Sequence, residues 1–252
     1  MDLEPEPVQI STTENQILMR YRLAGRDQMA ASTARPREMP DSLMSMQIHE
    51  SAINNVVTRF EFGGKKLNTQ ELIDYINKMF QTELSTKELD DNKTANFEFA
   101  PFDPIRIDFD EGKVELVINL KSFQVGKGKQ WKRLTVKAVY DAQIESGFNI
   151  KLIQTEDGLH LKGRRLNPTD KIAIRLICGA LFPEELSVRL MPEHLGSQLS
   201  VNTLQATQFV LSDGWLGISV DDAQRIADRQ HQYQESPRPR QTRRFRNRWR
   251  QE

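Results

Sequence analysis

Residues 102–123 read Phe102-Asp-Pro-Ile-Arg-Ile-Asp-Phe-Asp-Glu-Gly-Lys-Val-Glu-Leu-Val-Ile-Asn-Leu-Lys-Ser-Phe123, and apolar residues alternate with polar ones along two runs. Because successive side chains of a strand point to opposite faces, this period places the apolar residues of both runs on one face and most charges on the other. Between the runs lies Asp110-Glu-Gly-Lys113, whose glycine favours a tight turn. The stretch therefore predicts a β-hairpin with one dry face, which other parts of the chain must cover.

The same kind of patterning continues on both sides of this hairpin. Apolar residues at helical spacing predict helices over 50–60 and 68–80 and a nearly all-apolar helix over 170–182. Alternation predicts extended segments at 8–23 (a hairpin), 44–48, 134–140, 148–152, 159–161 (after a turn at Asp157-Gly158), 186–191, 199–211 and 215–220. Since strands follow strands rather than alternate with helices, the predicted class is α+β, a curved antiparallel β-meander with amphipathic helices packed on its apolar face.

Composition divides the chain into three parts. Residues 1–42 hold the first hairpin and a linker, residues 43–220 form the α+β domain, and residues 221–252 hold a short helix and a disordered arginine-rich tail. The acidic, proline-rich start is typical of a linker rather than a signal peptide, so we expect this chain to be the carboxy-terminal piece of a longer protein. No apolar run is long enough for a transmembrane helix.

Three short motifs contain residue types found in enzymes or ion sites, and each has an ordinary structural explanation. His49-Glu-Ser51 combines catalytic residue types, but consecutive residues of a helix point in different directions, so helix-start polarity is expected instead. Asp108–Gly112 resembles the start of a calcium loop without its later ligands, and the glycines of Val125–Lys129 precede a strand rather than a helix. The single cysteine, Cys178, is expected to be an inert core thiol. We therefore expect this chain to have no catalytic activity and to bind no metal ion and no cofactor.

The net charge of the chain is zero, but the tail from Ser236 onward holds seven arginines and one glutamate. Arginines interleaved with aromatic residues suit an anionic membrane surface or RNA, and a solubilising tail is the alternative. We expect a membrane surface or a protein partner rather than nucleic acid. The candidate polyanion contacts are Arg238, Arg240, Arg243, Arg244, Arg246, Arg248, Trp249 and Arg250.

The segment Met46-Gln-Ile-His-Glu-Ser-Ala-Ile-Asn-Asn55 and the elements that follow it resemble the small bacterial members of the tubular lipid-binding superfamily. These elements are the one-faced strands 105–109, 114–120, 134–140 and 148–152 and the apolar helix 170–182. The resemblance is one of pattern and covers residues 43–220, with departures at 30–42 and 85–96. It implies a long curved sheet around a helix, with acyl chains in the groove, and a place in the cell envelope, periplasmic or membrane-associated. Without the resemblance, the cytoplasm is expected.

The predicted function is non-catalytic binding of a lipid or other hydrophobic ligand in an apolar groove. The same residues would equally form a filled core, and the chain would then be a structural or interaction domain of a larger cell-envelope protein. Polyanion binding through the tail is a third hypothesis. The candidate groove residues are Ile53, Val57, Phe60, Leu116, Ile118, Val136, Leu176 and Ile177.

Overall fold

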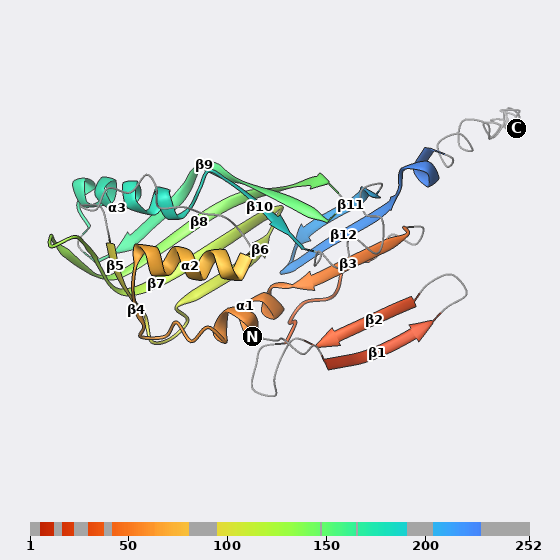
Figure 1. The fold of residues 1–252 in the computed structure, drawn as a ribbon, viewed down its shortest axis with the longest axis horizontal. Helices are drawn as coiled ribbons and strands as arrows, with labels where there is room; N and C mark the ends of the chain where they lie inside the picture. Colours follow the sequence, from red (N-terminus) through yellow and green to blue (C-terminus); the bar gives the residue numbers. More distant parts are fainter. Residues whose placement is uncertain are drawn as a thin grey trace, which may run out of the picture.

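The fold was obtained as a computed structural model of the 252-residue chain. The structure describes residues 6–12, 17–22, 30–37, 42–80, 95–146, 148–164, 166–190 and 204–227. Within these residues the labelled helices are α1 (Glu50–Thr58), α2 (Thr69–Phe80) and α3 (Pro168–Leu181), and a further short helix covers residues 223–227, within the part predicted to hold one (Figure 1). The strands are β1 (Glu6–Thr12), β2 (Ile17–Arg22), β3 (Met44–His49), β4 (Lys66–Asn68), β5 (Ala95–Phe99), β6 (Ile105–Asp110), β7 (Lys113–Val125), β8 (Gln130–Ser146), β9 (Asn149–Gly163), β10 (Glu185–Arg189), β11 (Leu204–Ser212) and β12 (Trp215–Asp222).

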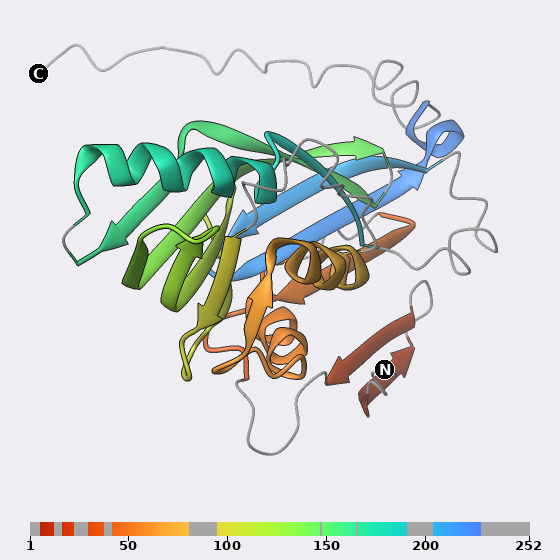
Figure 2. The ribbon, with the colours of Figure 1, turned by 60° about the vertical axis from the view of Figure 1, so that its left-hand side comes forward.

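The strands form three sheets in which neighbouring strands pair in antiparallel fashion. The largest has seven strands in the order β10-β9-β8-β7-β5-β4, with β6 also paired to β7. A three-stranded sheet has the order β11-β12-β3, and the predicted first hairpin forms a separate sheet of β1 and β2 (Figure 2). The predicted α+β class with an antiparallel sheet is confirmed.

The predicted central hairpin is present as β6 and β7. Asp110 pairs with Lys113 across the turn, and the two residues between them, Glu111 and Gly112, have positive φ values of 44° and 80°. Two positive φ values are typical of a type I′ turn, whose twist matches that of the flanking strands. The alternation is confirmed as well, because Ile107 of β6 is buried and Asp110 is exposed.

The prediction of a separate strand at 159–161 after a turn at Asp157-Gly158 is wrong, because β9 runs unbroken through these residues. The register between β8 and β9 shifts there, so that Val139 of β8 stands opposite residues 155–158 of β9. Such an excess of residues on one strand is a bulge. A Cβ on Gly158 would lie 2.6 Å from the Val139 carbonyl oxygen. The glycine therefore marks a close backbone approach within a strand pair rather than a chain reversal.

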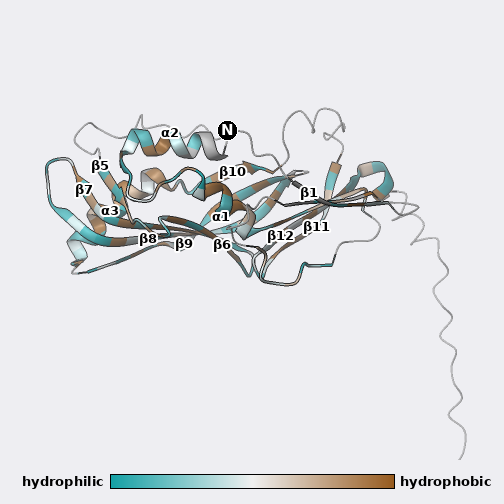
Figure 3. Ribbon diagram, turned by 90° about the horizontal axis from the view of Figure 1, so that it is seen from below, coloured by the Kyte–Doolittle hydropathy of each residue, from teal (hydrophilic) through white to brown (hydrophobic). Residues whose placement is uncertain are grey.

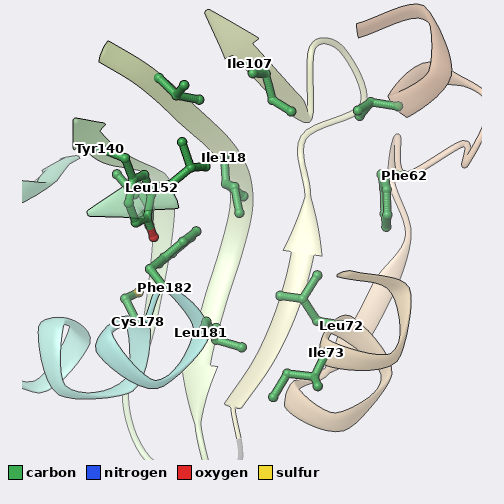
Figure 4. Packing of buried hydrophobic residues seen from close by; sticks show 14 of the residues in the cluster. Phe62, Leu72, Ile73, Ile107, Ile118, Tyr140, Leu152, Cys178, Leu181 and Phe182 are labelled. Atoms are coloured by element: carbon green, nitrogen blue, oxygen red, sulfur yellow. The ribbon is translucent and has the colours of Figure 1, made fainter. Parts of the chain in front are cut away.

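Helices and strands contribute side chains to one cluster of buried apolar residues (Figure 4). From the helices, α1 contributes Val57, α2 contributes Leu72 and Ile73, and α3 contributes Ile174 and Leu181. Figure 3 views the largest sheet nearly edge-on and places α1 and α2 on the same side of its strands. The core thus draws side chains from the helices and from the strands of both larger sheets.

Two buried polar side chains tie α1 and α2 to neighbouring strands. Asn54 of α1 donates to the Ile107 carbonyl at 2.7 Å and accepts from the Ile107 N–H at 2.8 Å. Thr69 of α2 accepts from the Ala95 N–H at 2.8 Å and donates to the Ala95 carbonyl at 3.3 Å. Each side chain therefore satisfies both backbone groups of one strand residue, as a neighbouring strand would.

Polar residues satisfy the first backbone N–H groups of α2 and α3. The Asn68 side chain accepts from the Glu71 N–H at 2.9 Å, and the Glu71 carboxylate accepts from the Asn68 N–H at 2.7 Å. This is the predicted capping box. α3 begins in the same way, with Asn167 and Asp170 in the two roles and Pro168 in its first turn.

None of the helices described is long and apolar enough to cross a membrane.

Strands from opposite ends of the domain lie side by side in the three-stranded sheet. β3 pairs with β12, and Met44 stands opposite Val220. The predicted turn at 213–214 joins β11 to β12, and both of its residues have positive φ. This turn lies next to the central hairpin, where the Gly112 N–H donates to the Leu211 carbonyl at 2.7 Å. The two larger sheets are thus hydrogen-bonded to each other at their turns.

Candidate ligand cavity

An apolar cavity of about 100 Å³ lies where strands β6–β10 and β12 meet α1 and the end of α3. Every lining side chain is apolar except for the hydroxyl group of Tyr140. Strands β6 to β9 supply Ile107, Phe109, Val114, Leu116, Tyr140, Ile150 and Leu152. The rest of the lining consists of Ile53, Leu181, Phe182, Pro183, Leu186, Val188, Leu190 and Leu216.

The register of the sheet places its lining residues in rows. Phe109 of β6 stands opposite Val114 of β7, which stands opposite Tyr140 of β8. In the neighbouring row, Ile107 stands opposite Leu116. Directly opposite residues share one face of a sheet, so alternate positions of these strands converge on the cavity. The alternation that predicts the dry face therefore also accounts for much of the lining.

Tyr140 carries the hydroxyl group in this otherwise apolar lining. Burial raises the pKa of Tyr140 well above its ordinary value, and the neighbouring Gln154 side chain offsets part of that rise. The hydroxyl therefore stays protonated at physiological pH, where it can donate a hydrogen bond but not act as a base. Tyr140, Leu152 and Phe182 all line the cavity and lie close together in Figure 4.

Two of the eight predicted groove residues, Ile53 and Leu116, line the cavity. Phe60 is half-buried, and its ring lies 6.0 Å from that of Phe62, away from the lining. Four others are buried in the core without lining the cavity, namely Val57, Ile118, Val136 and Ile177. The sequence pattern thus identified the dry face but not the part of it that remains unfilled.

Leu176 is 75% exposed and does not line this cavity. α3 buries Ile174 and Cys178 instead. From Ile172 to Leu181 every residue of α3 except Arg175 is apolar, so the periodicity does not show which side faces the core. The lining residues of β10 were missed, although the alternation of Leu186 and Val188 is the signal that would have indicated them.

His49 and Ser51 contact each other, contrary to the expectation that they point in different directions. His49 precedes α1 in an extended conformation, and its Nδ1 lies 2.9 Å from Ser51 Oγ and accepts from the Ser51 N–H at 3.1 Å. Because a backbone N–H only donates, the proton of the neutral ring lies on Nε2. Nε2 faces the Thr33 hydroxyl at 3.3 Å, which donates to the Asp213 carbonyl at 2.6 Å. Ser51 is only 7% exposed, and this buried network caps the start of α1.

We expect His49 to make the stability of the fold depend on pH. Burial lowers the pKa of His49 below its ordinary value of 6.5, although the nearby Glu50 charge opposes the change. The unfolded chain then binds a proton more readily, so this stabilising contribution is complete above about pH 6.5 and is lost as the pH falls toward the lowered pKa.

The variant His49→Asn tests this expectation, because asparagine caps helices without titrating. We expect its melting temperature to change less than that of the wild type between pH 7.5 and pH 5. Thermal unfolding of both proteins at the two pH values measures the difference. An equal change in the two proteins would contradict the role given to His49.

The other sequence motifs have structural roles. In the stretch that resembles a calcium loop, the Asp108 carboxylate lies 2.9 Å from the guanidinium of Arg106. Lys129, at the end of the glycine-containing turn, lies 2.7 Å from Asp170, and β8 follows it as predicted. Burial raises the pKa of Cys178 to about 12, so this thiol is unreactive. Within the described ranges, no group of three His, Cys, Asp or Glu side chains is placed to hold a metal ion.

The eight candidate polyanion contacts, from Arg238 to Arg250, lie outside the residues that the structure describes. No model of a known protein family matches this chain, and no curated protein matches it in sequence. The resemblance to the tubular lipid-binding superfamily therefore stays a prediction. The cavity and its lining are the observations from which a function can be argued.

Proposed function

We propose that this chain is a non-catalytic domain that binds a hydrophobic ligand in the apolar cavity. The observation that carries the proposal is the composition of the lining, in which only the Tyr140 hydroxyl is polar. Such a space favours hydrocarbon and excludes charged groups, which would lose their hydrogen bonds to water without replacement. In this proposal the sheet curves around the cavity, and α1 and α3 pack over its apolar face.

The volume of the cavity limits the kind of ligand. At about 100 Å³ it is smaller than an engineered protein cavity of roughly 150 Å³ that binds benzene. It therefore accommodates the end of an alkyl chain or a small ring, and a longer ligand must extend beyond it.

The variant Val188→Trp tests whether the cavity is the binding site. Val188 is half-buried and lines the cavity, so a larger side chain there fills the space. Val125 is also half-buried against the same core but does not line the cavity, which makes Val125→Trp a matched control. In titrations with a fluorescent fatty acid, we expect saturable binding to the wild type and to Val125→Trp, and at least about tenfold weaker binding to Val188→Trp.

Mass spectrometry of organic extracts from the purified protein provides a second measurement, and we expect it to detect a co-purified hydrophobic compound. Equal affinities of the two tryptophan variants would contradict the assignment of the site. If the extract contains no ligand and the fatty acid shows no saturable binding, the domain is better explained as a structural or interaction module.

A further inference from the structure

A polar residue, Gln154 of β9, continues the apolar row that lines the cavity. It stands opposite Tyr140, on the same face of the sheet as Val114 and Phe109. Its Nε2 atom is buried beside the Tyr140 hydroxyl, but within the described part of the chain no acceptor meets its two N–H groups at normal hydrogen-bond geometry. Buried donors normally have an acceptor, so this N–H group suits an oxygen atom of a ligand.

Gln154 also lines a groove of about 390 Å³ beside the carboxy-terminal half of α3. The other lining residues are Ile172, Arg175, Leu176, Gly179, Phe182 and Glu184. Phe182 lines this groove and the apolar cavity alike. The two spaces therefore adjoin at Phe182, and a ligand that occupies both of them would contact this residue.

The groove offers both apolar and cationic surface to a ligand. Ile172 and Leu176, one helical turn apart, are 61% and 75% exposed. Between them in sequence, Arg175 makes one hydrogen bond among the described residues, a long one of 3.4 Å to the Leu159 carbonyl. Most of the guanidinium N–H groups are therefore available to an anion, next to apolar side chains that suit an alkyl chain.

We propose that the ligand is an amphipathic carboxylate, with its carboxylate in the groove and the end of its alkyl chain in the cavity. The carboxylate accepts hydrogen bonds from Arg175 and from Gln154 Nε2, and the chain passes Phe182. Arginine suits this role because its guanidinium is always charged and donates in a planar fork. The inference rests on the proposed function, and it explains how a cavity that holds only a chain end can serve a longer molecule.

The carboxylate of Glu184 lies at the same groove and opposes an anionic ligand. Its removal therefore reports the charge of the ligand's head group. We expect Glu184→Gln to tighten the binding of a carboxylate about two- to threefold at low salt, and less at high salt, because ions screen exposed charges. The binding of an uncharged ester should not change.

Calorimetric titrations with dodecanoate and with methyl dodecanoate test the head-group site. We expect the wild type to bind dodecanoate at least about tenfold more tightly than the ester. Arg175→Gln should remove this preference. Lys171→Gln is the matched control, because Lys171 is an exposed cation on the same helix that does not line the groove, and both affinities should stay within about twofold.

Gln154→Met tests the buried amide, because methionine retains much of the side-chain volume and loses the donor. We expect it to weaken both probes by about threefold or more, since each has an oxygen that can accept from Nε2. Melting temperatures close to that of the wild type would show that the variants fold.

Two results separate this inference from the proposed function. If both probes bind equally well, and neither Arg175→Gln nor Gln154→Met changes their affinities, the head-group site is overturned. Binding that Val188→Trp still weakens would then leave the cavity as the site of a purely apolar ligand. If neither probe binds the wild type, the inference and the proposed function are both overturned.

Discussion

Ile118→Asp is expected to lower the free energy of unfolding by about 4 kcal/mol or more. Ile118 is 5% exposed and stands opposite Ile105 on one side and Val136 on the other. A carboxylate at this position loses its water and gains no partner, which places the change among the most destabilising single substitutions. Urea unfolding followed by tryptophan fluorescence measures the effect, and absence of a folded state in buffer would be its extreme form.

Gln143→Asp is the control for this variant. Gln143 of β8 is exposed and stands opposite Lys151, so a carboxylate there stays hydrated and near a positive charge, and we expect a change within about 0.5 kcal/mol. Asn119 is less suitable, because its amide accepts from Thr135 at 2.9 Å and donates to the Asp103 carbonyl at 2.8 Å. Equal unfolding midpoints for the two aspartate variants would show that the faces of β7 are assigned wrongly.

Asn54→Leu is expected to destabilise the fold by about 3 kcal/mol or more, although the two side chains are similar in size. Asn54 is 6% exposed and satisfies both backbone groups of Ile107, which is itself 4% exposed. Leucine leaves both groups buried without a partner, and each such group costs roughly 1–3 kcal/mol. Thermal and urea unfolding measure the total, and faster hydrogen exchange at the Ile107 amide would locate the loss.

Thr58→Ala is the control on the same helix. Thr58 is exposed, and its hydroxyl donates to the Asn54 carbonyl at 2.8 Å, an acceptor that the helix can satisfy without it. Alanine also has the higher helix propensity, so we expect a change within about 0.5 kcal/mol. If Asn54→Leu is as stable as Thr58→Ala, the position of α1 against β6 does not depend on the Asn54–Ile107 pair.

Features set by neighbouring residues could be predicted from the sequence. Alternation identified the buried face of β6 and β7, and the Asp110–Lys113 turn follows from the glycine at its third position. Asn68 and Asn167 indicated where α2 and α3 begin, because a capping side chain satisfies N–H groups only three residues away. In each case the residues that determine the feature lie only a few positions apart in the sequence.

Features set by distant contacts could not be predicted in this way. Val117 is 8% exposed although it lies on the charged face of β7, where its register partners are Arg106 and Lys137. The long aliphatic stems of such side chains can cover an apolar neighbour. Gly158 indicates a turn in the sequence, yet its role depends on the backbone of the neighbouring strand. The cavity could not be predicted for the same reason, because its volume depends on how far side chains from separate elements reach toward one another.

The pairing of β3 with β12 has a consequence for the order in which the chain acquires its structure. Met44 of β3 pairs with Val220 of β12, so β3 leaves the ribosome long before the strand with which it pairs. Closing so large a loop is slow, and the meander between these strands can pair first because its contacts are local. During synthesis the backbone N–H and C=O groups of β3 therefore stay unpaired, and a strand of another chain can pair with them. Nascent chains that stall before Trp215 are expected to aggregate, whereas chains from which β12 has left the ribosome can form the β12–β3 pair.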